Sequence, residues 1–263
     1  MDLQLTKKVA LVTGSTAGIG NAIAASLARE GATVIVSGRT PAAVDSAVAA
    51  MRSETGGDVI GFAGDLSEAS VAEELAGRHP AVDILVNNLG IFEVRPFEDI
   101  ADADWQRFFD VNVLSGARLA RLYLPAMRKR NWGRIIFISS ESGYHIPAEM
   151  IHYGMTKAAQ IAVARGLAET TAGTGITVNS VLPGPTRSRG VGNFVAAMAA
   201  KSGKSAQTVE SEFFKSARPT SLLQRFATPE EVAAMVTYVA SPLASATNGA
   251  ALRVDGGTIK SAF

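Results

Sequence analysis

The sequence has no cysteine, few aromatic residues and almost no net charge. Without cysteine it forms no disulfide, no cysteine-ligated zinc site and no thiol nucleophile, which fits the reducing cytoplasm that we expect as its location. A formal net charge of +1, with no basic cluster interleaved with aromatics, argues against a nucleic-acid partner. The three histidines show no metal-ligand spacing, so no metal site is expected.

Long apolar runs are also missing. No run approaches the roughly 18 residues of a membrane-spanning helix, so we expect no membrane span. Residues 1–8 lack the apolar core of a signal peptide. The hydrophobic fraction is nevertheless 47%, with aromatics at 6%, which predicts an aliphatic core. Such a core is typical of parallel strands that helices cover on both faces.

Short apolar runs alternate with helical patterns along most of the chain, which predicts right-handed crossovers and a parallel sheet. We therefore predict a single doubly wound (Rossmann-type) α/β domain over residues 1–263, with a seven-stranded parallel sheet and helices on both faces. The strands are expected at 9–12, 33–37, 59–63, 83–86, 134–138, 177–181 and 250–254.

Three further expectations concern two helices and one irregular segment. One long helix is expected over residues 104–130, and Ser67 is expected to cap the helix that covers residues 70–76. Segment 188–221 breaks the rhythm because it contains no clear strand. Since long insertions usually serve a function, we predict that this segment is a lid over a substrate. An oligomer contact or a mobile loop is the alternative.

A glycine-rich turn, residues 13–20, follows the first strand and opens the first helix with the sequence T-G-S-T-A-G-I-G. Missing side chains let the backbone approach a pyrophosphate, and the first N–H groups of the helix point toward it. The spacing of Gly14, Gly18 and Gly20 differs from the usual G-x-G-x-x-G. A tight strand-to-helix turn without a ligand is therefore the alternative.

The end of the second strand bears on the choice of nicotinamide cofactor. An acidic residue there binds the ribose hydroxyls of NAD, whereas an arginine accommodates the 2′-phosphate of NADP. This chain has Ser37-Gly38-Arg39 and no acid. Arg39 offers a planar fork that suits phosphate, which favours NADP, although a solvated surface arginine would look the same.

Tyr153 and Lys157 form a candidate acid/base pair, because residues four apart share one helix face. An unperturbed tyrosine has a pKa of roughly 10, and a nearby ammonium lowers it by stabilising the phenolate. Ser140, at the end of the fifth strand, is placed to hydrogen-bond a substrate oxygen as charge develops on it. A tyrosine–lysine pair at this spacing is often only structural, but its place after that strand favours chemistry.

Together these residues resemble the short-chain dehydrogenase/reductase family over essentially the whole chain, and broadly its 3-oxoacyl-(acyl carrier protein) reductase branch. The shared motifs are the T-G-x-x-x-G-I-G turn, N-N-x-G at 87–90, V-N-V around Asn112, Ser140, the Tyr153–Lys157 pair and N-S-V-x-P-G at 179–184. The resemblance implies an enzyme that transfers a hydride between a nicotinamide cofactor and a carbonyl or secondary alcohol.

The resemblance also implies roles for single residues. Tyr153 is the general acid in reduction and the base in oxidation, and Lys157 lowers its pKa and binds the nicotinamide ribose. Ser140 polarises the carbonyl, and Asn112 holds a water that links Lys157 to solvent. The implied cofactor-binding residues are Gly14, Ser15, Thr16, Gly18, Ile19, Gly20, Arg39, Asp65, Leu66, Asn88, Gly90, Tyr153, Lys157, Pro183, Gly184 and Thr186.

Two departures from the family pattern affect these expectations. Leu89 replaces the usual alanine of N-N-A-G. Ser15 and Thr16 stand where NADP-preferring members often carry a basic residue, so Arg39 alone favours NADP.

The sequence leaves the substrate class open: a hydrophobic or acyl ketone, or an acyl thioester, fits the apolar residues near Ser140, whereas Glu141 and His145 would instead recognise hydroxyls. An NAD-dependent alcohol, polyol or sugar dehydrogenase and a non-catalytic nucleotide-binding scaffold are the alternative functions. The family resemblance implies a homotetramer.

Overall fold

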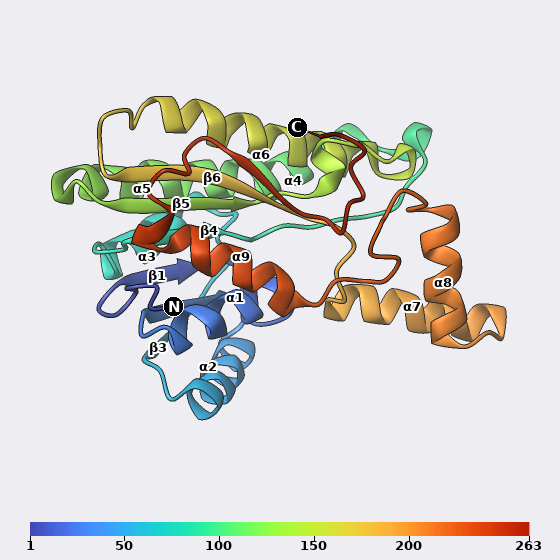
Figure 1. Ribbon diagram of the computed structural model, residues 1–263, viewed down its shortest axis with the longest axis horizontal. Coiled ribbons are helices and arrows are strands. Elements are labelled where there is room, and N and C mark those ends of the chain that lie inside the picture. Colours follow the sequence, from blue (N-terminus) through green and yellow to red (C-terminus); the bar gives the residue numbers. More distant parts are fainter. Residues whose placement is uncertain (263) are drawn as a thin grey trace.

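The computed structural model describes residues 1–262, with all of their side chains except those of residues 189, 193 and 194. A parallel seven-stranded sheet lies at its centre, in the order β3-β2-β1-β4-β5-β6-β7 (Figure 1). This confirms the predicted fold class. The strands are β1 (Val9–Val12), β2 (Thr33–Gly38), β3 (Val59–Ala63), β4 (Ile84–Asn87), β5 (Gly133–Ile138), β6 (Ile176–Pro183) and β7 (Ala251–Val254).

Helices connect the strands and cover the sheet. They are α1 (Gly18–Arg29), α2 (Pro41–Thr55), α3 (Ala69–Arg78), α4 (Asp102–Phe109), α5 (Ser115–Arg130), α6 (Ile151–Glu169), α7 (Arg189–Ser202), α8 (Ala206–Ser216) and α9 (Pro229–Ala240). None of the helices in residues 1–262 is both long and apolar enough to cross a membrane.

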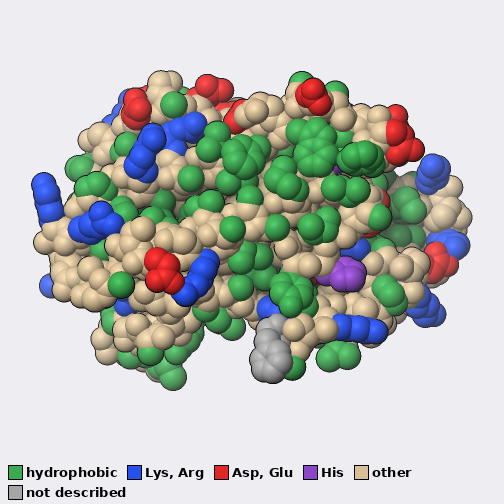
Figure 2. All heavy atoms as spheres, turned by 90° about the horizontal axis from the view of Figure 1, so that it is seen from above, with side chains coloured by type: hydrophobic (Ala, Val, Ile, Leu, Met, Phe, Trp, Pro, Cys, Tyr) green, Lys and Arg blue, Asp and Glu red, His purple; other side chains and the backbone are tan. Residues whose placement is uncertain are grey.

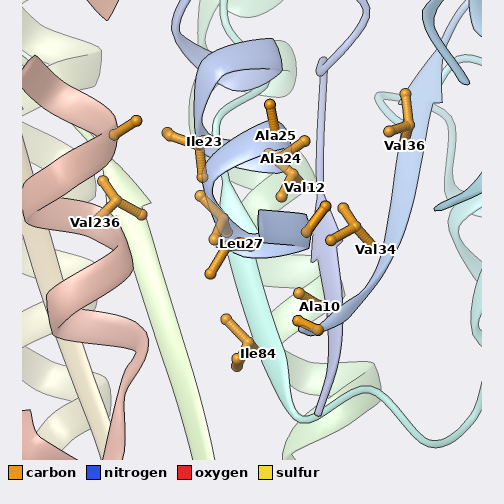
Figure 3. Packing of buried hydrophobic residues seen from close by; sticks show 14 of the residues in the cluster. Ala10, Val12, Ile23, Ala24, Ala25, Leu27, Val34, Val36, Ile84 and Val236 are labelled. Atoms are coloured by element: carbon orange, nitrogen blue, oxygen red, sulfur yellow. The ribbon is translucent and has the colours of Figure 1, made fainter. Parts of the chain in front are cut away.

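The core is divided by the sheet into two aliphatic layers, because successive strand residues point to opposite faces. On one face Ala10 and Val12 pack against α1, α2 and α9, and Figure 3 shows Ile23 of α1 near Val236 of α9. On the other face Leu11 belongs to a second cluster with residues of α3, α5 and α6. The predicted aliphatic core is thus observed on both sides.

Two expectations about helices are wrong. Glu68, not Ser67, precedes α3, and the Ser67 hydroxyl donates instead to Asp65 Oδ1 at 2.6 Å. The expected long helix over residues 104–130 is interrupted by a π-helical turn, Asp110–Leu114, between α4 and α5. In such a turn the backbone hydrogen bonds run from i to i+5 instead of i to i+4, and π-helical turns are frequent at functional sites.

Segment 188–221 has no strand, as expected, but it is more regular than a loop. It contains α7 and α8, which project from one end of the domain (Figure 1). Val195, Val209, Phe214 and Phe226 form a small buried cluster of their own. The two helices therefore share a small apolar cluster that is separate from the two layers of the main core.

The sheet also fixes where a ligand site is possible. β1 and β4 are neighbours, and the chain leaves them toward opposite edges of the sheet. In open parallel sheets ligands bind beyond the carboxyl ends of the strands at such a switch point. The glycine turn follows β1, the 87–90 turn belongs to the end of β4, and Ser140 follows β5, so all three lie along this edge.

Candidate active site

The glycine turn is held against the 87–90 turn by the side chain of Asn88. Its amide nitrogen donates to the carbonyl oxygens of Thr13 at 2.9 Å and Gly14 at 3.1 Å. Gly14 and Gly18 both have a φ of +61°, which favours glycine. A Cβ at Gly20 would overlap the Asn88 amide and lie 2.7 Å from the Gly14 carbonyl oxygen. Glycine is thus required at position 20 by close approach.

The start of α1 fits the pyrophosphate of a dinucleotide. No side chain caps this helix, and its first turn contains no acidic residue. The first N–H groups of a helix otherwise lack partners, and they carry the positive end of the helix dipole. An anion placed beyond Gly18 and Ile19 would satisfy them.

Replacing Gly20 by alanine is expected to weaken this site. Overpacking of this kind costs roughly 1–3 kcal/mol, and displacing Asn88 should also lower the affinity for a nicotinamide dinucleotide. Thermal unfolding and fluorescence titrations with the reduced dinucleotides measure the two effects. Gly166→Ala on α6 is the matched control, because its Cβ would meet nothing within 4 Å; it should bind the dinucleotide normally and gain about 0.5–1 kcal/mol. Normal affinity in Gly20→Ala would contradict the assignment.

Arg39 lies just beyond β2 with an exposed side chain. Across the described part of the chain no hydrogen bond or ion pair engages its guanidinium. The adjacent Gly38 is held close to Thr16, since a Cβ at Gly38 would lie 2.5 Å from the Thr16 methyl group. Arg39 therefore stands beside the glycine turn with its donors available to a phosphate.

Some of the other predicted cofactor residues have exposed side chains, and others have side chains that are buried or hydrogen-bonded within the chain. Asp65 is exposed, whereas the Leu66 side chain is buried in the second core cluster. The Ser15 hydroxyl donates to Val12 O at 2.7 Å and accepts from Ser37 N, so it joins β1 to β2. Side chains of Leu66, Ser15 and Asn88 thus support the backbone here, rather than facing a ligand.

At the end of β6 the chain passes close to β7. A Cβ at Gly184 would lie 2.6 Å from the carbonyl oxygen of Asp255. Pro183 ends β6, and the buried Thr186 donates its hydroxyl to Gly184 O at 2.9 Å. These three residues form a compact turn along the same edge of the sheet as Ser140.

The candidate acid/base residues come together because α6 is pressed onto the turn that follows β5. Gly143 and Gly154 permit this contact: a Cβ at Gly143 would lie 2.7 Å from the Lys157 carbonyl carbon, and one at Gly154 3.0 Å from Ser142 O. Tyr153 lies in the first turn of α6, where the positive helix end favours a nearby anion. Its phenol hydrogen-bonds with Ser140.

Lys157 is buried, and its Nζ lies 5.6 Å from the centre of the Tyr153 ring. The Nζ donates to Ile138 O at 2.9 Å and to Gln160 Oε1 at 3.0 Å. Burial lowers the pKa of Lys157 to about 7. The amine is therefore poised to change charge near neutral pH, rather than being a permanent ammonium as the spacing alone suggested.

Tyr153 has several charged and polar neighbours besides this lysine. Burial raises the pKa of the phenol, and the carboxylate of Glu141 raises it further. The hydrogen bond with Ser140 and the positive charge of Arg218 lower the same pKa. Acidity of the phenol thus depends on two residues, Glu141 and Arg218, that the sequence analysis did not assign to catalysis.

Asn112 lies fully buried in the π-helical turn. Its side chain accepts from Ile91 N at 2.8 Å and donates to Thr156 Oγ1 at 2.9 Å, and its backbone carbonyl accepts from Gln160 Nε2 at 2.6 Å. Gln160 therefore connects Asn112 to Lys157. A Cβ at Gly90 would lie 3.4 Å from both Asn112 Oδ1 and Lys157 Nζ, so Gly90 completes this network.

Gln160 was missed by sequence reasoning, although a signal was present. It lies three residues after Lys157, so the two share a helix face, and it is polar among small apolar neighbours. The exposed apolar residues near Ser140 were partly foreseen: Tyr144 and Ile146 are exposed by 60% and 47%. Phe92 contacts Tyr153 edge-on, with ring centroids 6.4 Å apart.

Comparisons with known proteins agree with this geometry. The model of the short chain dehydrogenase family matches residues 8–215. The chain is 47% identical over 264 residues to an uncharacterized oxidoreductase, YvaG, of Bacillus subtilis, covering all of both chains. It is 35% identical over 260 residues to D-beta-hydroxybutyrate dehydrogenase of Cupriavidus necator, covering 97% of this chain and 99% of that one.

A solved structure, L-sorbose reductase from Gluconobacter frateurii complexed with NADPH and L-sorbose, superposes with a TM-score of 0.93 at 30% identity. The match covers 99% of this chain and 100% of that one. The protein belongs to the short-chain dehydrogenase/reductase family. It is an NAD(P)-dependent oxidoreductase of that family.

Proposed function

We propose that the protein reduces a ketone to a secondary alcohol with NADPH. This proposal rests on one observation: the candidate dinucleotide site and the candidate acid/base residues lie along the same edge of the sheet. The uncapped start of α1 lies at the switch point beside a free Arg39, and Ser140 hydrogen-bonds with Tyr153 at the end of β5. A site of this kind holds a dinucleotide and protonates an oxygen beside it.

The residues of this chain have distinct parts in the reaction. NADPH, when bound, supplies the hydride that adds to the carbonyl carbon. The Tyr153 phenol donates its proton to the carbonyl oxygen, which becomes the hydroxyl of the product. Ser140 hydrogen-bonds the same oxygen and orients the substrate. The tyrosinate that remains regains a proton through Lys157 and the polar network of Gln160 and Asn112.

The proposed preference for NADPH rests on Arg39 and on the similarity of this chain to a relative of known structure. Arg39 is exposed and directly follows Gly38, which packs against Thr16, and no acid occupies the end of β2. The superposed L-sorbose reductase is complexed with NADPH. A planar guanidinium suits the 2′-phosphate that distinguishes NADP from NAD.

An Arg39→Asp variant is expected to reverse the cofactor preference. Loss of a charge-assisted hydrogen bond costs about 1.5–3 kcal/mol, and repulsion between carboxylate and phosphate adds to it. The kcat/KM ratio of NADPH over NADH should therefore fall by at least roughly 10- to 100-fold. Arg78→Asp on α3 is the control, because its side chain is 65% exposed and its interactions, an ion pair with Glu74 and a cation–π contact with Phe62, do not involve the glycine turn. An unchanged ratio in Arg39→Asp would remove the basis for NADPH.

The substrate class is proposed as a small ketone, and hydroxylated ketones come first because the superposed relative binds L-sorbose. A screen of keto sugars, alkyl ketones and 3-oxoacyl thioesters with both cofactors, read by absorbance of the reduced nicotinamide, tests this. Oxidation of polyols with NAD alone would favour the alternative dehydrogenase. Cofactor binding without turnover of any compound would favour a non-catalytic scaffold.

We propose further that the chain forms a homotetramer through the face that carries α6. Figure 2 shows hydrophobic side chains spread over this face between charged ones. Ala158, Ala159 and Ala162 are small and not fully buried, which permits close approach of a second copy. Light scattering of the purified chain measures the number of subunits.

A further inference from the structure

A glutamate follows the candidate catalytic serine directly and is buried beside it. Glu141 is 4% exposed, and its Oε2 accepts the hydrogen bond that the Ser140 hydroxyl donates. The backbone N–H of Ser142 donates to both Ser140 Oγ, at 3.1 Å, and Glu141 Oε2, at 2.9 Å. One amide thus fixes the hydroxyl and the carboxylate against each other.

The charge of Glu141 is balanced by an arginine that is distant in the sequence. Arg218 Nε donates to Glu141 Oε1 at 3.0 Å, and the two side chains are 13% and 6% exposed. Arg218 follows α8, and its backbone N–H donates to Phe213 O at 3.2 Å. Its Nη1 also lies 3.5 Å from Glu149 Oε1. Segment 188–221 is therefore joined to the acid/base site by a buried ion pair.

A serine hydroxyl has one proton to donate and two lone pairs. In this structure the proton goes to Glu141, and one lone pair accepts from Ser142 N. The phenolate of Tyr153 and the oxygen of a substrate need that same proton. Glu141 therefore competes with the reacting oxygens for the Ser140 proton, and the positive charge of Arg218 weakens this competition.

We propose that Glu141 and Arg218 are a positioning pair that decides where Ser140 directs its hydroxyl proton, and that the docking of α8 acts on the chemistry through Arg218. Resting on the proposed function, this inference adds two residues to the site. With Arg218 docked, the carboxylate is partly neutralised and Ser140 turns readily to the reacting oxygen. Without Arg218, the carboxylate holds the proton and Tyr153 is harder to ionise.

The charges around the phenol agree with this description. Glu141 raises the pKa of Tyr153 and Arg218 lowers it. Lys157 faces the ring from α6, with its Nζ 5.6 Å from the ring centre, and Glu149 faces Arg218 from the short turn before α6. Glu141 and Arg218 thus change the acidity of the phenol in opposite directions.

The experiment is the pH dependence of kcat/KM for oxidation of the alcohol product with NADP⁺, in which Tyr153 acts as base. Activity then rises with pH as the phenol ionises, and this rising limb of the pH profile reports the pKa of the phenol. Opposite or like charges within about 4–6 Å shift a pKa by about one unit or more. Glu141→Gln should therefore move this limb about one pH unit down, and Arg218→Gln about one unit up.

Two further variants separate positioning from simple damage to the fold. Arg218→Lys keeps the charge and should restore most of the shift, even if overall activity stays low. In a Glu141→Gln background, Arg218→Gln should move the limb much less, because the carboxylate that Arg218 balances is gone. Lys204→Gln, which breaks an exposed pair with Glu212 on the same segment, is the control and should leave the limb in place.

The outcomes are distinguishable from those of the proposed function. If Glu141→Gln and Arg218→Gln lower activity without moving the limb in opposite directions, the positioning pair is overturned while the catalytic assignment stands. If the limb is also present in Tyr153→Phe, it does not report the phenol, and both the catalytic assignment and the pair are overturned.

Discussion

Replacing Tyr153 by phenylalanine will lower kcat for ketone reduction by about 10²- to 10⁴-fold, the usual contribution of a positioned general acid. Phenylalanine keeps the ring, and with it the edge contact to Phe92 and the packing beside Lys157. It removes only the hydroxyl that hydrogen-bonds with Ser140. The loss should therefore appear in kcat, measured by the rate of NADPH oxidation with a saturating ketone.

Binding and stability provide the controls for this variant. The dissociation constant for NADPH, measured by fluorescence, should change little, because the glycine turn and Arg39 are untouched. Tyr238→Phe on α9 removes a hydroxyl from a 41% exposed tyrosine outside the candidate site, and it should keep full activity. A Tyr153→Phe enzyme as active as the unmodified protein would remove Tyr153 from the mechanism.

Replacing Lys157 by methionine will lower turnover and raise the stability of the protein, both by a large amount. Turnover should fall by at least about 10²-fold, because the network that returns a proton to Tyr153 in the proposed mechanism loses its central amine. At the same time the protein should become more stable near pH 7, because a buried amine is replaced by an apolar side chain of similar length. A variant that is less active and more stable is typical of a strained functional site.

The stability effect has a defined pH dependence. Burial lowers the pKa of Lys157 from 10.5 to about 7 in the folded chain, so the unfolded chain binds the extra proton between these values. The cost of burying the amine is therefore complete below about pH 7 and fades as the pH rises toward 10.5. At roughly 1.36 kcal/mol per pKa unit, this cost is on the order of 3–5 kcal/mol.

Chemical denaturation at several pH values measures this cost. The free energy of unfolding of Lys157→Met should exceed that of the unmodified protein at pH 6–7, and the difference should shrink by pH 10. Lys129→Met, at an exposed position on α5, should show no such trend. A variant that is less stable at pH 6 than at pH 10, relative to the unmodified protein, would show that the lysine is stabilised rather than strained.

Much of the fold was predictable because its determinants are local. Each strand is a short aliphatic run, and the alternation with helical patterns predicts the parallel sheet. The Tyr153–Lys157 pair and the glycine turn were equally accessible, since their geometry follows from helix periodicity and from backbone conformation. The family resemblance then supplied an expectation for most positions, and the comparisons confirmed the family.

Features that depend on contacts between distant segments were not predictable. The π-helical turn at 110–114 interrupts an amphipathic pattern that continues on both sides of it, so the sequence indicated one helix. Glu141 and Arg218 are 77 residues apart, and neither belongs to a motif. Ser67 was expected to cap a helix from its residue type alone, but the nearby Asp65 carboxylate provides a stronger acceptor for its hydroxyl.

Lys157 shows most clearly how packing changes an expectation that was based on helix spacing alone. Spacing along α6 predicts that the amine lies near the phenol, and it does. Burial of that helix face against the sheet lowers the pKa of the amine, and its hydrogen bonds run to Ile138 O and Gln160 rather than to Tyr153. Acidity of the phenol is therefore a property of the whole polar network, including Ser140, Glu141 and Arg218.

The transfer of deuterium from NADPH that carries deuterium at both C4 positions of the reduced nicotinamide tests the central claim most directly. The labelled cofactor is incubated with the ketone that the screen identifies, and the alcohol product is analysed by mass spectrometry and NMR. One deuterium is expected on the carbinol carbon with the unmodified protein, and almost none in the same time with Tyr153→Phe. Absence of label from the product of the unmodified protein, or equal labelling by both proteins, would contradict the central claim.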